Sequence, residues 1–373
     1  MNRAAGHTRL DEIVLRRVRL PLIRPYRLSY RTFTEFEPII VELRSSDGRI
    51  GWGEGHISPG SSSETREGGW NFCREYAAKI LRQDAQAAKA IVAATRTASK
   101  VAATALITAI EMLEGNPVLQ SESEIRLPLV TPLNATEPQE IADEVERRLA
   151  EGFRTFKVKV GTDVDADLAR VAAIQAAIAG RAAIRIDANR GYSQRDACRF
   201  AAVLDAEGIE LFEQPCAAQD WEANARVAKV STVPLMLDEP ICELDDIDRA
   251  GAIEGVAFCK LKLKRFGGLD RLRQALDRVS ARAMEPVLGD GLSSEIGCWM
   301  EACAARDTIR NAGEFNGFLK PKVRLFSQPL NFTGGELIVP ASFVASIDRE
   351  VLKSHEVVSE RFAPVTVSMS RTA

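Results

Sequence analysis

The stretch from Phe156 to Gly268 is the most informative about the fold, because short apolar runs recur in and around it and each run ends in charged residues. The runs are TFKVKVG (155–161), AAIRIDAN (182–189), IELFEQP (209–215), PLMLDEP (234–240) and AFCKLK (257–262). Steps of 28, 26, 25 and 24 residues separate their charged ends, in the order Lys159, Asp187, Glu213, Asp238 and Lys262. A parallel βα unit of a barrel recurs at about that period, since each strand needs a helical crossover to return. The pattern therefore predicts three carboxylates from consecutive strands, with a lysine on each side, at one face of a barrel.

Length and composition are those of a soluble enzyme. The chain has 373 residues, enough for two domains or a large barrel with an addition. Its net charge of −3 disfavours a nucleic-acid partner. No apolar run approaches the ~20 residues that span a bilayer, and the first residues lack the apolar core of a signal peptide. Seven cysteines without a CxxC pair suit reduced thiols. We expect a cytoplasmic protein with no membrane or nucleic-acid partner.

The N-terminal third has a different pattern. Alternating apolar residues at 11–20, 38–44 and 50–54 predict a small antiparallel meander. The polar segments 24–36 and 55–63 are predicted to be long loops, which often serve function. Helices are predicted from Glu64 onward, the last an Ala-rich segment at 98–113 that stops at Gly115.

The rest of the chain predicts the barrel and a tail. Residues 127–133 are predicted as the first barrel strand and 137–151 as its helix, and the alternation continues to an eighth strand near 310–316. Beyond Lys320 the only candidate strand is 337–340, and the end of the chain shows no clear pattern. We expect an α/β fold in three parts: an N-terminal α+β capping domain (1–125), a (β/α) barrel with the catalytic site (126–322), and a C-terminal segment that returns to the cap (323–373).

Asp187, Glu213 and Asp238 are predicted to bind a metal ion. Carboxylates are hard oxygen ligands, so the set suits Mg²⁺ or Mn²⁺ with open positions for a substrate's oxygens, whereas zinc would call for His or Cys. Cys216 and Cys242 lie nearby in sequence but past the strand ends, which disfavours thiolate ligation. The alternative is that the three carboxylates are salt-bridge partners in the barrel mouth.

Lysines supply the acid/base groups. Lys157 and Lys159 share one face of a strand, since residues i and i+2 point the same way. A second lysine and a dication nearby should lower a lysine's pKa toward the range of a general base. Lys262 stands across the carboxylates from Lys159, but Lys260 and Lys264 share its face, so the pattern does not choose among these three.

A metal-bound carboxylate substrate has an acidified α-hydrogen, because the metal stabilises the enediolate that deprotonation forms. Two lysines on opposite faces allow proton removal from one side and return from the other, which is racemisation. They equally allow removal followed by loss of a β-leaving group. The sequence therefore indicates removal of the α-proton more clearly than it indicates the step that follows.

At these residues the chain resembles the enolase superfamily, and within it the muconate-lactonizing branch. The similar motifs are Lys157-Val-Lys159, Asp187-Ala-Asn189, Glu213-Gln-Pro215, Asp238-Glu239-Pro240, Lys262-Leu-Lys264-Arg-Phe-Gly267-Gly268 and Gly51-Trp-Gly-Glu54. The resemblance implies a modified TIM barrel of the (β/α)7β type with a cap. It implies that Lys159 and Lys262 are the acid/base pair, that Lys157 assists electrostatically, and that the protein is a homo-oligomer.

Further residues are predicted around the substrate or behind the ligands. Asn189 and Glu239 belong to the metal motifs. Histidine occurs only at 7, 56 and 355, so the His/Asp dyad of mandelate-racemase-like branches is absent. His56 is predicted either to contact the substrate or to be structural. The remaining candidates are Asp290, Glu314, Asn316 and Tyr26, with Arg24 and Tyr30 weaker; Asp290 and Glu314 could hold a cationic amine or face water.

The leading functional hypothesis is a Mg²⁺-dependent racemase or epimerase of an amino acid or amino-acid derivative, with a small carboxylate substrate that carries an amine. The second hypothesis is a lyase on the same scaffold, such as a dehydratase of a hydroxyproline-type substrate, or a cycloisomerase. Two others are a metal-free racemase with two catalytic cysteines and a barrel without catalytic activity. The cysteines form no paired motif, and no member of the metal set is missing.

Overall fold

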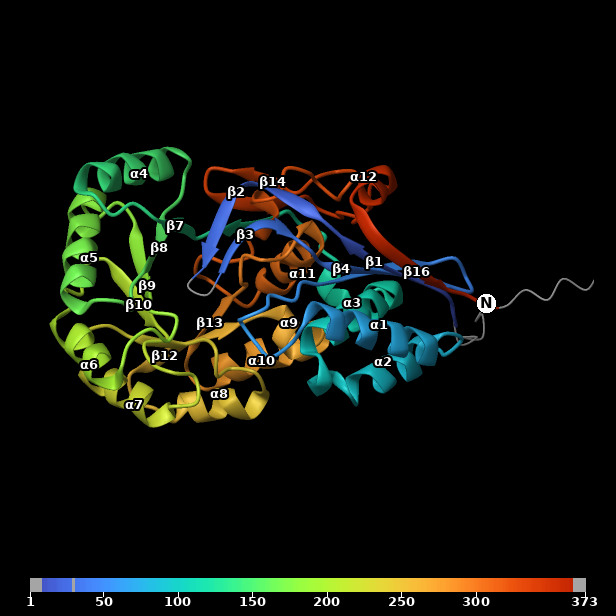
Figure 1. The fold of residues 1–373 in the computed structure, drawn as a ribbon, viewed down its shortest axis with the longest axis horizontal. Helices are drawn as coiled ribbons and strands as arrows, with labels where there is room; N and C mark the ends of the chain where they lie inside the picture. The colour runs from blue at the N-terminus through green and yellow to red at the C-terminus, as the bar shows by residue number, and fades with distance from the viewer. Residues whose placement is uncertain (1–8, 29–30, 365–373) are drawn as a thin grey trace, which may run out of the picture.

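The computed structural model describes residues 9–28 and 31–364. A curled sheet of parallel strands lies at one end of the molecule, and a smaller domain of antiparallel strands and helices lies at the other (Figure 1). The parallel sheet has the spatial order β13-β12-β11-β10-β9-β8-β7. Its strands are β7 (Thr131–Leu133), β8 (Thr155–Lys159), β9 (Ala183–Asp187), β10 (Ile209–Glu213), β11 (Leu235–Leu237), β12 (Val256–Leu261) and β13 (Glu285–Leu288). Chain order and spatial order agree, which confirms the predicted succession of βα units.

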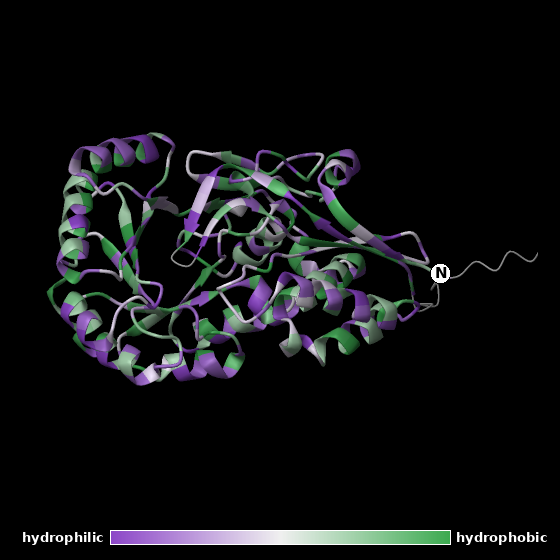
Figure 2. Ribbon diagram, in the orientation of Figure 1, coloured by the Kyte–Doolittle hydropathy of each residue, from purple (hydrophilic) through white to green (hydrophobic). Residues whose placement is uncertain are grey.

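Helices follow these strands, and most of them cover the outside of the sheet (Figure 1). They are α4 (Pro138–Ala150), α5 (Val164–Ile178), α6 (Gln194–Val203), α7 (Trp221–Val230), α8 (Leu244–Gly251), α9 (Leu263–Phe266), α10 (Leu269–Ala281) and α11 (Glu295–Ala305). Hydrophobic and hydrophilic residues alternate along the covering helices, as expected for elements with one face on a core (Figure 2). Each of these helices is too short or too polar to span a bilayer, as are all others in the described chain.

The prediction of an eighth strand at 310–316 is wrong, because this segment does not form an extended strand. Gly313 alone forms a parallel bridge, to Leu129, and the N–H of Glu314 donates to the carbonyl of Leu288 at 2.8 Å. The guanidinium of Arg185, buried inside the barrel, donates to the carbonyl of Ala312 at 2.8 Å. That side-chain bond takes a backbone acceptor that a longer ladder would use. Within described residues 310–316, the backbone hydrogen bonds to the two edges of the sheet are those of Gly313 and Glu314.

The cap contains a four-stranded antiparallel sheet in the order β16-β1-β4-β5. Its strands are β1 (Leu10–Val18), β4 (Ile39–Ser45), β5 (Ile50–Gly55) and β16 (Glu356–Phe362), and its helices are α1 (Arg66–Ile80), α2 (Ala85–Ala93) and α3 (Lys100–Glu114). The predicted meander and the Ala-rich helix are confirmed. A Cβ added to Gly51 or Gly53 would lie 2.0 Å from a carbonyl oxygen of α3, so the Gly-Trp-Gly repeat of β5 lets the helix backbone lie directly on the strand.

Two expectations about the segments that flank the barrel were wrong. Residues 24–36 are not a loop, because the described part of this segment belongs to a hairpin of β2 (Leu20–Leu28) and β3 (Arg31–Phe36). The predicted strand 127–133 is two strands: β6 (Ile125–Pro128) pairs with β15 (Glu336–Val339), which pairs with β14 (Asn331–Thr333), and only β7 joins the barrel.

The last described strand of the chain lies at the edge of the cap sheet. After α12 (Arg349–Ser354), β16 pairs with β1 at the edge of the cap sheet. The side chains of β16 are mostly exposed, so an edge strand held by backbone bonds left no apolar alternation to detect.

Candidate active site

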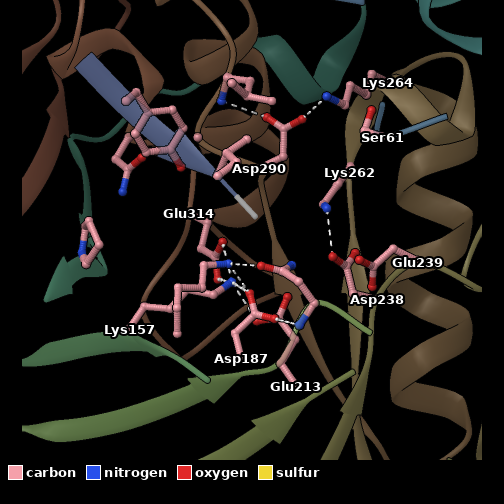
Figure 3. A pocket seen from close by; sticks show the side chains of 18 of the residues that line it. Ser61, Lys157, Asp187, Glu213, Asp238, Glu239, Lys262, Lys264, Asp290 and Glu314 are labelled. Carbon is pink, nitrogen blue, oxygen red and sulfur yellow. Dashed lines mark hydrogen bonds and ion pairs between the residues drawn. The ribbon is translucent and has the colours of Figure 1, made fainter. Parts of the chain in front are cut away.

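A cavity of about 450 Å³ opens at the carboxyl ends of the barrel strands. Cap residues 25–28 of β2 and residues 61, 62 and 64 of the loop between β5 and α1 form part of its wall. The charged side chains in it come from separate strands and turn toward one another (Figure 3). The carboxyl ends of barrel strands are where active sites of this architecture are built.

The structure brings the three predicted metal carboxylates into this one cavity. Asp187 and Glu213 end neighbouring strands and are partners in the ladder, and Asp238 follows the next strand. All three are buried. Burial alone would raise the pKa of Asp187, but the ammonium groups of Lys157 and Lys159 outweigh it and lower that pKa. Burial and the neighbouring Asp187 raise the pKa of Glu213 to about 7, against the effect of Lys157.

Lys157 lies within this carboxylate group. Its Nζ is 2.8 Å from Asp187 Oδ2, 2.6 Å from Glu213 Oε2 and 3.0 Å from Glu314 Oε1. Burial by itself would lower the pKa of Lys157, yet the three carboxylates raise it well above its ordinary value. Each neighbouring carboxylate thus favours the charged form of this lysine.

Lys159 and Lys262 lie on either side of the carboxylates. Lys159 ends β8, and its Nζ is 2.5 Å from both Asp187 Oδ2 and Asn189 Oδ1. Lys262 follows β12, and its Nζ is 2.9 Å from Asp238 Oδ2. The strands β9, β10 and β11 separate β8 from β12 in the sheet. Lys262 reaches Asp238 on one side of the cavity, and Lys157 reaches Asp187 on the other (Figure 3).

The structure also separates the three lysines that the pattern could not distinguish. Lys260 is fully buried, and its Nζ pairs with Glu314 Oε1 at 2.5 Å. Lys264 lines the cavity and pairs with Asp290. Lys262 alone of the three pairs with one of the predicted metal carboxylates.

Arg265 is a site residue that the sequence analysis did not select. Its guanidinium donates to Asp238 Oδ1 at 2.8 Å and also to the backbone carbonyl of Asp238. The short helix α9 returns Arg265 toward Lys262, three residues earlier. Residues three positions apart on a helix lie on the same side, so this spacing could have identified Arg265 from the sequence. Arg190 is a second such residue, with its Nε 3.2 Å from Glu239 Oε1.

Most of the residues predicted to lie around the substrate or behind the metal ligands are found in the cavity wall. Asp290, Glu314, Asn316 and Tyr26 all line the cavity, and so do Asn189 and Glu239. The two carboxylates Asp290 and Glu314 face lysines rather than water or open space. Burial would raise the pKa of Asp290, but Lys264 and Lys262 lower it. The side-chain amide of Asn316 donates to the carbonyl of Val130 at 2.8 Å.

His56 is not part of the cavity wall. It is buried, its ring packs 5.0 Å from that of Phe36, and its Nε2 accepts the N–H of Glu37 at 3.3 Å. Burial first, and then the charge of Lys264, lowers the pKa of His56 to about 3. Arg24 does not line the cavity, and Tyr30 and His7 lie outside the described residues.

The donor set fits a hard divalent cation by its chemistry. It offers buried carboxylate oxygens only, and Glu213 Oε2 makes no hydrogen bond despite its ion pair with Lys157. Within residues 9–28 and 31–364, no three His, Cys, Asp or Glu side chains are gathered as a metal site. The oxygens face lysine ammonium groups, so a cation at this position competes with Lys157, Lys159 and Lys262.

Comparison with known proteins gives consistent matches over most of the chain. Residues 140–343 match the family described as "Enolase C-terminal domain-like", and residues 11–113 match the N-terminal domain of mandelate racemase and muconate lactonizing enzyme. L-Ala-D/L-Glu epimerase of Bacillus subtilis (strain 168) is 24% identical over 87% of this chain and 92% of its own. o-Succinylbenzoate synthase of Geobacillus kaustophilus is 29% identical over 77% and 79%.

A solved structure confirms the fold. N-succinyl Arg/Lys racemase from Bacillus cereus superposes with a TM-score of 0.87, covering 95% of this chain and 100% of that one, at 22% identity. A likeness at that identity establishes the shared architecture of barrel and cap. The match of the family model to residues 140–343, more than half of the chain, establishes the family. The chain therefore belongs to the mandelate racemase and muconate lactonizing enzyme family of the enolase superfamily.

Proposed function

We propose that this protein is a Mg²⁺-dependent racemase or epimerase of an amino-acid derivative, which removes the proton α to the substrate carboxylate. One observation carries the proposal. Lys159 and Lys262 flank the carboxylates of Asp187, Glu213 and Asp238 from opposite sides of one cavity. A pair of bases on opposite sides is what inversion of a stereocentre requires.

Enzymes of this family use a divalent metal ion. In this chain Asp187, Glu213 and Asp238 would hold it, and the oxygen donors favour Mg²⁺, with Mn²⁺ as a second ion of similar preference. When bound, the cation would offset the negative charge that develops on the substrate carboxylate as the α-proton leaves.

The lysines divide the remaining work. In its neutral form one of Lys159 and Lys262 accepts the α-proton, and the other, in its charged form, delivers a proton to the opposite face. Asn189 Oδ1 and Asp187 fix the Nζ of Lys159, and Asp238 fixes that of Lys262. Lys157 keeps its charge because three carboxylates surround it, so its role is electrostatic rather than proton transfer.

Relatives support the reaction type. The names of two of the proteins described above, an epimerase of a dipeptide and a racemase of N-succinyl amino acids, denote reactions that invert a stereocentre. The alternative is an elimination on the same scaffold. We retain it as the second candidate, because the chain is also similar to o-succinylbenzoate synthase, which is named neither a racemase nor an epimerase. Both begin with removal of the α-proton.

Proton NMR in D₂O tests the proposal. The protein is incubated with Mg²⁺ and a panel of amino acids, N-acylated amino acids, betaines and hydroxyprolines. Deuterium at Cα with the carbon skeleton intact supports the racemase, and a new unsaturated or keto product establishes the elimination instead. Absence of exchange across the panel, with the metal shown to bind, refutes the amino-acid substrate class.

A further inference from the structure

Arg170 connects the ends of two barrel strands from outside the cavity. It lies on α5, and its guanidinium donates to three backbone carbonyls: that of Leu133 at 2.9 Å, that of Ala135 at 3.0 Å and that of Lys159 at 2.9 Å. Leu133 ends β7, and Lys159 ends β8. Arg170 is not among the residues that line the cavity. One charged side chain thus holds the backbone of a predicted acid/base lysine without bordering the space for the substrate.

The hydrogen bonds of Arg170 continue the link between β7 and β8 beyond the last pair of their ladder. That last pair is Leu133 with Val158, one residue before Lys159. On its other side Lys159 is still paired, with Asp187 of β9. The backbone of Lys159 is therefore held by strand pairing toward β9 and by the guanidinium toward β7.

Asp167 holds the residues that follow Lys159. It lies three positions before Arg170 on α5, so the two side chains lie on the same side of the helix. Asp167 Oδ2 accepts the N–H of Gly161 at 2.9 Å and that of Thr162 at 3.1 Å. Helix α5 thus bonds both a carbonyl and the N–H groups of the short segment that ends β8 and leaves it.

The position of the Lys159 ammonium depends on this backbone. The side chain starts from the strand end that Arg170 holds, and its Nζ reaches Asp187 Oδ2 and Asn189 Oδ1. A shift of the strand end would move Nζ relative to the α-carbon of a bound substrate. Proton transfer is sensitive to such a shift, since a misplacement of about 1 Å can cost on the order of 10²-fold in rate.

Lys262 does not share this support. It follows β12, and the N–H of the next residue, Leu263, donates to Glu301 Oε1 of α11 at 3.1 Å. The described hydrogen bonds of Arg170 go to the ends of β7 and β8 and to the residue 135 beside them. Loss of the guanidinium should therefore disturb the Lys159 side of the cavity and leave the Lys262 side in place.

We propose that Arg170 is a positioning residue for Lys159, and that it sets the rate of proton transfer on the face of the substrate nearer to Lys159. This inference rests on the proposed function, which assigns Lys159 and Lys262 to opposite faces. Arg170 acts only through hydrogen bonds to the backbone. The competing interpretation is a structural link between β7 and β8, whose loss would slow proton transfer on both faces alike.

The experiment compares α-proton exchange of two enantiomers. Resolved D and L forms of the panel compound that the wild type exchanges fastest are incubated separately with Mg²⁺ in D₂O, and initial rates are followed by proton NMR. The variants are Arg170→Met and Arg170→Lys, with Arg154→Met as the control. Lys159→Ala identifies the enantiomer whose proton Lys159 removes. Thermal melts report on folding, and calorimetric titration with Mg²⁺ reports on the metal site.

Arg154 is a matched control, because its guanidinium also donates to backbone carbonyls next to β8. Its acceptors are Leu149 at 3.1 Å and Phe153 at 2.8 Å, which lie before the amino end of the strand, opposite to the cavity. The side chain of Arg154 is exposed. Arg154→Met should therefore exchange both enantiomers at nearly the wild-type rates.

We expect Arg170→Met to slow exchange of the enantiomer that depends on Lys159 by about 10- to 100-fold, mainly through kcat, and to exchange the other at nearly the wild-type rate. Its affinity for Mg²⁺ should stay close to that of the wild type. Arg170→Lys keeps the charge but cannot bond three carbonyls at once, so its rate should fall between the two. If Arg170→Met does not fold, the same comparison of enantiomers with Arg170→Lys decides.

The inference and the proposed function fail in different ways. Equal slowing of both enantiomers by the Arg170 variants, or no slowing of either, overturns the role of Arg170 and leaves the racemase standing. Selective slowing of the enantiomer that depends on Lys262 also overturns this inference alone. Absence of exchange by the wild type across the panel overturns the two together, because Lys159 would then transfer no proton.

Discussion

The ammonium group of Lys157 lies 2.6 Å from a carboxylate oxygen of Glu213, and both side chains are buried. The two residues are on β8 and β10, with β9 and its Asp187 between them. Lys157 therefore balances negative charges that consecutive strands bring into one small volume. Its high pKa is the electrostatic consequence of that position.

Replacement of Lys157 by Met should expose this dependence. The substitution leaves Asp187, Glu213 and Glu314 facing one another without the shared cation. We expect a loss of about 3 to 5 kcal/mol in the free energy of unfolding, as for a broken buried ion pair. Urea denaturation with and without saturating Mg²⁺ checks this, since a bound cation should restore part of the loss. Equal loss in both conditions would contradict a shared role for Lys157 and the metal.

Lys159→Ala and Lys262→Ala should separate the two faces of the substrate. Each should lower racemisation by at least ~10²-fold, the scale of a lost general acid or base. Each variant should still exchange the α-proton of one enantiomer with D₂O, and the two variants should spare opposite enantiomers. NMR on resolved enantiomers is the measurement. If both variants spared the same enantiomer, the lysines would not act on opposite faces.

Metal removal should abolish proton exchange, and Mg²⁺ should restore it. Asp187→Asn, Glu213→Gln and Asp238→Asn should each weaken Mg²⁺ binding by about tenfold or more in calorimetric titration, because each removes a charged oxygen ligand. Cys216→Ala is the control and should bind Mg²⁺ as the wild type does. Retention of exchange in EDTA would instead favour a metal-free mechanism.

The buried His56 should make the fold sensitive to acid. Its pKa is about 3 in the folded protein against an ordinary 6.5, so below pH 6.5 the unfolded chain binds a proton that the folded one does not. Stability is therefore lost as pH falls. Between pH 7 and pH 5 the wild type should lose about 2 kcal/mol more than His56→Gln. Denaturant titrations of both proteins at the two pH values check this, and parallel pH profiles would contradict it.

Glu54 should stabilise the contact between cap and barrel. From β5 its carboxylate accepts the N–H of Ser294 at 2.7 Å and that of Gly297 at 2.9 Å, at the first turn of α11. Glu54→Ala leaves these buried donors without an acceptor and should cost about 3 kcal/mol. Glu75→Ala, which removes only an exposed pair with Lys79, should leave stability nearly unchanged. Chemical denaturation measures both, and similar stabilities of the two variants would refute the role of Glu54.

The residue pattern alone predicts the succession of βα units and the strand ends at which Asp187, Glu213 and Asp238 lie. The reason is local: a strand alternates its faces every residue, and the spacing between strand ends reflects one crossover. The strand β5 and the helix α3 could also be predicted, because each is indicated by the pattern of residues within its own segment. Exposed edge strands such as β16 were not, because backbone pairing leaves little trace in side chains.

Which charged side chains face one another depends on how the strands and the cap pack in three dimensions. Lysine occupies every second position from Lys260 to Lys264. The acidic partners of these lysines, Glu314, Asp238 and Asp290, nevertheless come from three other segments of the chain. The burial of His56 was likewise not predictable from the sequence. Ion pairing depends on distances between side chains far apart in the chain, and those distances exist only once the sheet has curled and the cap has packed on it.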